Sequence, residues 1–141
     1  MRFMILLKAS ADSEAGAMPE EPLIAAMADY HEQLAQAGVL LDASGLQPSA
    51  KGWRIRYEGG RRQVIDGPFA ETQELIAGYT LIQVRSREEA LDWTRRFPAP
   101  HGDTVRGEIE VRQVYELDDF GPSESMARFR KIDLGHPQAA T

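Results

Sequence analysis

The apolar residues of this chain change their spacing several times, and the order of those changes limits the folds that it can adopt. Residues 3–7 form a continuous apolar run with polar neighbours, which is typical of a central strand covered on both faces. Between Pro19 and Gly38, apolar residues then recur at helical spacing, at Leu23, Met27, Tyr30 and Leu34. Proline is tolerated in the first turn of a helix and glycine is favoured at its C-terminal cap. We therefore expect a strand followed by one amphipathic helix.

A β-hairpin is predicted in the middle of the chain. Residues 53–58 alternate large apolar side chains with charged ones, the period-two pattern of a half-buried strand. Gly59-Gly60 is a two-residue turn signal, and residues 61–66 return as the partner strand. We expect Trp53 to belong to the core.

Further patterns complete the order of elements. Three strands and one helix are predicted, with strands at residues 39–41, 79–84 and 109–115 and a helix at residues 86–97. Ser86 and Glu89 have the spacing of a capping box at the start of this helix. With the hairpin set aside, the order is βαββαβ, so the predicted fold class is α+β and ferredoxin-like, with an inserted β-hairpin.

Composition limits the classes of function. The chain has 141 residues, 43% hydrophobic and 27% charged, as expected of one globular domain. Its net charge of -6 argues against a general nucleic-acid-binding protein, which would usually carry a basic excess. The absence of cysteine excludes disulfides and thiolate metal sites, and it fits the reducing cytoplasm, where we expect the protein.

No membrane segment, metal site or cofactor site is predicted. The N-terminal apolar run is shorter than the roughly 7–15 residues of a signal peptide core, and no stretch approaches the ~20 apolar residues of a membrane span. His31, His101 and His136 lack metal-ligand spacing. The sequence also has no phosphate loop and no glycine-rich dinucleotide fingerprint.

The stretch that follows the predicted hairpin reads Asp66-Gly67-Pro68-Phe69-Ala70-Glu71. Proline restricts the residue before it, while glycine tolerates almost any backbone geometry and aspartate is a frequent turn former. This signature resembles the DGPF subgroup of the YCII-related domain family, and the resemblance extends over roughly the first 120 residues. It implies a dimeric α+β barrel type of fold. It implies no particular reaction, because the family is largely without assigned substrates.

The predicted fold needs a partner. Two helices cover one face of an antiparallel sheet, so the other face requires a cover, and a second copy of the chain is the simplest one. The resemblance also implies a homodimer. We expect residues 1–121 to form the YCII-related domain and residues 122–141 to form a polar tail with at most a short helix.

The resemblance suggests Asp66 as a catalytic acid or base, with a helix histidine elsewhere in the chain. His31 is the available partner, although the wider family's helix histidine falls about one turn earlier, where this chain has Met27. Phe69 would form an apolar wall, and Glu71 would place a second carboxylate nearby. A turn-forming aspartate, a helix histidine without a task and a solvated acidic loop are the alternatives at these positions.

Arginines are concentrated on the predicted hairpin of this acidic chain. Arg54 and Arg56 could bind a carboxylate or phosphate, or they could simply protect a sheet edge. Two functions remain open. One is cofactor-free acid/base chemistry, an isomerisation or elimination, on a small acidic compound. The other is a non-catalytic dimer that binds a small ligand or regulates, which the resemblance links to alternative sigma factor systems.

Overall fold

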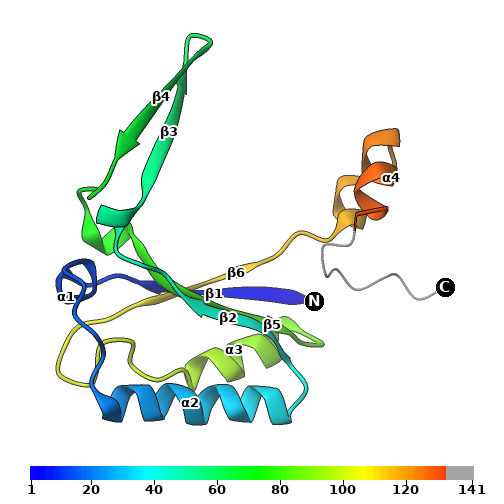
Figure 1. The fold of residues 1–141 in the computed structure, drawn as a ribbon. Coiled ribbons are helices and arrows are strands. Elements are labelled where there is room, and N and C mark those ends of the chain that lie inside the picture. Colours follow the sequence, from blue (N-terminus) through cyan, green and yellow to red (C-terminus); the bar gives the residue numbers. More distant parts are fainter. Residues whose placement is uncertain (133–141) are drawn as a thin grey trace.

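The computed structural model describes residues 1–132, which are built around a four-stranded antiparallel sheet (Figure 1). The strands are β1 (Arg2–Lys8), β2 (Leu40–Gly45), β5 (Ile76–Gln83) and β6 (Ile109–Gln113). Their order across the sheet is β2-β5-β1-β6. This mixed α+β arrangement is consistent with the ferredoxin-like fold that the order of sequence patterns predicts.

Two helices, α2 (Glu21–Gln36) and α3 (Arg87–Arg95), lie on one face of the sheet (Figure 1). The core lies between these helices and the sheet. It consists of Phe3, Ile5, Tyr30, Leu34, Val39, Ile82, Val84 and Ala90. In α3 only Ala90 and Thr94 are buried, and Leu91 is 48% exposed.

The predicted hairpin forms as β3 (Trp53–Glu58) and β4 (Arg61–Asp66). It stands away from the sheet on the side opposite the helices, and we call it the hairpin arm (Figure 1). All of β3 is exposed, so the prediction of a half-buried strand is wrong. Trp53 is 64% exposed and lies outside the core. Alternation shows that one face of a strand is apolar, but it does not show what lies against that face.

A second projection rises at the other end of the sheet, on the same side as the hairpin arm (Figure 1). It contains η3 (Leu117–Phe120) and α4 (Glu124–Arg130), and we call residues 115–132 the C-terminal arm. The Arg2 guanidinium fixes its base by donating to both carboxylate oxygens of Glu116, at 2.9 and 3.0 Å. The last part of the expected tail, residues 133–141 with His136, lies outside the described residues.

Three short helical segments complete the described chain: α1 (Ala11–Glu14), η1 (Ser49–Lys51) and η2 (Thr72–Glu74). The first of them precedes α2 and has its own N-terminal cap. Ser10 and Ser13 form a reciprocal capping box, in which each side chain accepts from the backbone N–H of the other. Such a cap satisfies the first donors of a very short helix.

Candidate ligand site at the signature

The signature joins the hairpin arm to the sheet, and it packs there against the backbone of η1. Gly67 N–H donates to the carbonyl of Gly52 at 3.0 Å, across the base of the arm. A Cβ on Gly67 would lie 1.9 Å from the Ser49 carbonyl oxygen. Glycine is therefore required here for space, whereas the sequence suggested a need for backbone freedom. The Gly67–Pro68 peptide bond is cis.

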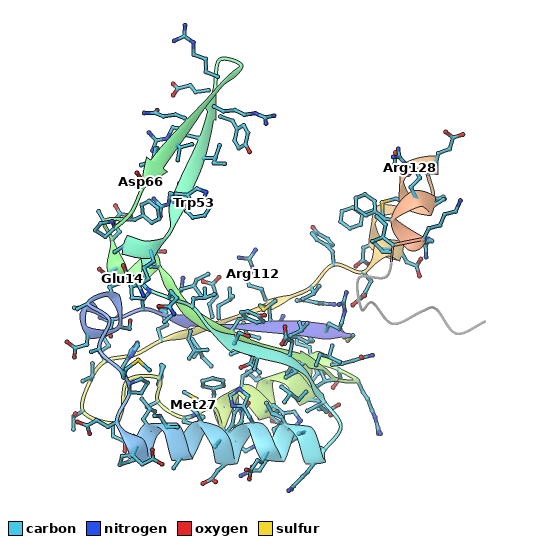
Figure 2. The ribbon with its side chains drawn as sticks, in the orientation of Figure 1. Glu14, Met27, Trp53, Asp66, Arg112 and Arg128 are labelled. Atoms are coloured by element: carbon cyan, nitrogen blue, oxygen red, sulfur yellow. The ribbon has the colours of Figure 1, made fainter. Side chains whose placement is uncertain are left out.

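Ser49 connects three segments that are distant in the sequence. Its hydroxyl donates to the Glu14 carboxylate and accepts from the Phe69 N–H at 3.1 Å. The Ser49 backbone N–H donates to Glu14 as well, at 3.0 Å. Figure 2 shows Glu14 at the foot of the hairpin arm. The carboxylate of the α1 segment therefore holds η1, and through η1 it holds the signature.

Arg54 covers the ring of Phe69. Its guanidinium carbon lies 3.8 Å from the ring centroid, the geometry of a cation–π contact. None of the groups that the structure describes accepts a hydrogen bond from this guanidinium or forms an ion pair with it. The stack fixes the plane of a cation whose N–H donors remain available to a ligand.

Asp66 lies on the opposite face of the hairpin arm. Residues directly opposite each other in an antiparallel pair share a face, and Asp66 pairs with Trp53 whereas Arg54 pairs with Ile65. Asp66 is exposed, and within the described part of the chain its carboxylate accepts no hydrogen bond. Glu71 is exposed too and has a left-handed backbone, with φ of 63°. Arg56 shares the face of Arg54, two residues further along β3.

Comparison with known proteins identifies the family of the chain. Residues 1–118 match the YCII-related domain. An uncharacterised protein of Rhizobium meliloti (strain 1021) is 33% identical over 95 residues, which cover 67% of this chain and 75% of that protein. The chain belongs to the YCII-related domain family.

In this YCII-related domain, His31 is part of the helix–sheet packing. One ring nitrogen, Nδ1, lies 2.7 Å from the Met27 carbonyl oxygen, and Nε2 lies 2.8 Å from the Thr80 hydroxyl. The ring also meets Phe97 edge-on, with centroids 6.2 Å apart. Met27, at the wider family's histidine position, lies on the side of α2 that faces the sheet (Figure 2). The fold therefore does not bring His31 and Asp66 together, since the helices and the hairpin arm lie on opposite sides of the sheet (Figure 1).

The described residues of the YCII-related domain contain no group of three metal-ligating side chains. Two surface depressions are present. One lies at the hairpin turn and is lined by residues 57–62, and the other lies between η3 and α4. Neither is lined by Asp66 or Phe69. None of the helices within residues 1–132 has the length and apolar character needed to cross a bilayer.

Sequence reasoning missed Ser49 as part of this region. Its partner Glu14 is 35 residues away, and no local pattern encodes such a contact. The acidic residues Asp12 and Glu14 before α2 were the available signal.

Proposed function

We propose that this protein binds a small organic acid at the signature, with Arg54 as the anchor and the Phe69 ring as the adjoining apolar wall. One observation carries the proposal: the Arg54 guanidinium is stacked on Phe69 with no acceptor among the described residues. A guanidinium matches a carboxylate or phosphate through two parallel hydrogen bonds. A guanidinium held in one plane loses less side-chain entropy when the ligand binds.

Arg56 extends the same cationic face. It lies two residues beyond Arg54 on β3, so its side chain points to the same side of the hairpin arm. A ligand with a second acidic group would reach Arg56.

Binding without turnover fits this geometry better than acid/base catalysis does. A catalytic Asp66 would have to meet the ligand that an arginine neutralises, but Asp66 and Arg54 lie on opposite faces of the same hairpin. Isomerisation or elimination by Asp66 therefore requires a second surface that brings the two groups around one ligand. The link to alternative sigma factor systems, which the DGPF resemblance implies, stays a prediction because no contact described above concerns it.

The test is a calorimetric or NMR titration of the full chain with acetate, succinate and inorganic phosphate. We expect at least one of these probes to bind with a Kd below about 1 mM. Arg54→Gln should weaken that binding at least about 10-fold, because it removes the bidentate partner. Arg62→Gln is the matched control: it removes the same charge from another arginine–aromatic pair of the arm, in which Arg62 lies 5.1 Å from the Tyr57 ring. Equal losses in the two variants, or no binding by the wild type, would refute the proposal.

A further inference from the structure

The face of the hairpin arm that carries Arg54 holds a second arginine in a fixed register. Arg56 follows Arg54 by two residues on β3, so both side chains leave the same face. Two residues of a strand span about 6.6 Å, at the usual rise of ~3.3 Å per residue. Arg56 is exposed, and within the described part of the chain its guanidinium forms no ion pair. The site of the proposed function therefore has two cations at a defined spacing.

The partner strand leaves both cations uncompensated. Arg54 lies opposite Ile65, and Arg56 lies opposite Gln63. Residues directly opposite each other in an antiparallel pair are close neighbours whose side chains interact. Neither arginine has a carboxylate at that position, so both positive charges are available to a ligand.

The cationic stretch ends one step closer to the hairpin turn. The next β3 residue on this face is Glu58, and Arg61 lies opposite it. Opposite charges at directly opposed positions attract each other, so this pair offers a ligand no net charge. The face therefore presents Arg54 and Arg56 as its two uncompensated cations.

Ile65 gives the space between the two arginines an apolar floor. It lies opposite Arg54 and is the diagonal neighbour of Arg56, so its side chain borders both. Ile65 is half-buried, whereas the other five residues of β4 are exposed. The Phe69 ring adds apolar surface against the Arg54 guanidinium, 3.8 Å from the ring centroid. A carbon chain that joins two acidic groups would contact apolar atoms along this path.

The two arginines differ in how firmly they are held. Arg54 is stacked on Phe69, and the Phe69 N–H donates to the Ser49 hydroxyl at 3.1 Å. Ser49 is held in turn by Glu14 through two hydrogen bonds. No such support holds Arg56 within the described chain. Arg54 is therefore the anchor for any acidic ligand, whereas Arg56 distinguishes ligands by the position of their second acidic group.

We infer that the ligand is an unbranched dicarboxylic acid of about six carbon atoms, a length set by the spacing of the arginines. One carboxylate binds Arg54, the other binds Arg56, and the methylene groups lie over Ile65. Each carbon–carbon bond of ~1.5 Å adds about 1.3 Å to an extended chain, so six carbons separate the carboxyl carbons by about 6.4 Å. This length matches the ~6.6 Å between successive residues of one strand face. The inference rests on the proposed function, because Arg54 remains the anchor.

The first test is a calorimetric titration of the full chain with hexanoate, malonate and adipate. Hexanoate has the carbon chain of adipate but one carboxylate, and malonate has two carboxylates that are too close together to reach both arginines. We expect adipate to bind at least about 10-fold more tightly than either. Arg56→Gln should weaken adipate binding at least about 10-fold and hexanoate binding less than about 3-fold, because only adipate has a second carboxylate to lose its partner.

Arg61→Gln is the matched control. It removes the same charge from the same face, at the position where Glu58 lies opposite, and we expect adipate affinity to change less than about 3-fold. Adipate that binds no more tightly than hexanoate or malonate would overturn the inference, as would equal losses of adipate and hexanoate binding in Arg56→Gln. In those cases binding of hexanoate through Arg54 would still support the proposed function. Failure of all three acids to bind would refute both.

A second measurement locates the bound carbon chain. In an isotope-filtered NMR experiment on the full chain, the methylene protons of adipate should show nuclear Overhauser effects to the methyl groups of Ile65. These effects should disappear in Arg56→Gln at the same adipate concentration, because the chain is no longer held at both ends. Tight binding of adipate without contacts to Ile65 would place the diacid elsewhere on the molecule and overturn the inference.

Discussion

Gly67 is the residue at which the least added volume should do the most damage. A methyl group there would overlap the Ser49 carbonyl, a backbone atom that cannot rotate away, and η1 would have to move. We expect Gly67→Ala to lower the free energy of unfolding by about 1–3 kcal/mol, the usual cost of overpacking. Gly45→Ala is the control, because a Cβ at Gly45 meets nothing within 4 Å. Urea denaturation measures both, and equal stability of the two variants would show that η1 yields easily.

Asp66 and Glu14 are the two carboxylates near the signature, and they should respond differently to neutralisation. Asp66 is exposed and accepts no hydrogen bond in the described part of the chain, so we expect Asp66→Asn to change the stability by less than about 0.5 kcal/mol. Glu14 accepts from both the backbone and the hydroxyl of Ser49, so Glu14→Gln should cost about 1 kcal/mol.

Thermal denaturation at neutral pH compares these two variants. Clear destabilisation by Asp66→Asn would identify a structural turn instead of a free carboxylate. If a turnover assay becomes possible, loss of activity in Asp66→Asn with an unchanged Tm would support acid/base chemistry.

At the scale of elements, Tyr30 ties α2 to α3. Its hydroxyl donates to the Trp93 carbonyl at 2.8 Å, and its ring packs edge-on against Phe97. Burial raises the pKa of Tyr30 to about 12, with Arg96 acting in the opposite direction. The folded chain therefore keeps the phenol proton at a pH at which the unfolded chain has lost it.

The pH dependence of stability follows from this shift. Below pH 10 the phenol is protonated in both states and its contribution is fully present. Between pH 10 and pH 12 the unfolded state binds fewer protons, so the stability falls, by at most about 1.4 kcal/mol per pH unit from this group. Denaturant unfolding at pH 9 and pH 11 should show a smaller decrease for Tyr30→Phe than for the wild type. Parallel decreases would contradict the assignment to Tyr30.

Local patterns predict these elements better than they predict their surroundings. The order of strands and helices and the turn at Gly59-Gly60 were read from spacing alone, because periodicity and turn chemistry are encoded within a few residues. Burial of Trp53 was predicted wrongly, since the alternation in β3 records an apolar face but not its neighbour. The Ser49–Glu14 and Arg54–Phe69 contacts depend on where the hairpin arm leaves the sheet, which no local pattern specifies.

At the scale of the whole molecule, the single chain leaves a large amount of apolar surface exposed to water. One face of the sheet is covered by the two helices, while both arms carry exposed aromatic residues that a lone soluble chain would rarely retain. We propose that a second copy of the chain is the simplest cover for these surfaces.

Pairing of this kind makes stability depend on protein concentration. Unfolding would then be coupled to dissociation, so a 100-fold rise in concentration adds about 2.7 kcal/mol per dimer, and the Tm should rise by roughly 4 °C for a chain of this size. Scanning calorimetry across that range tests the expectation. Ile55→Asp should lose most of the concentration dependence because it places a charge on the apolar face of the hairpin arm, whereas Gln63→Asp, on the other face, should keep it. A wild-type Tm that stays constant across the range would mean that folding does not require the second copy. The single chain would then be stable with the apolar faces of its arms exposed to solvent.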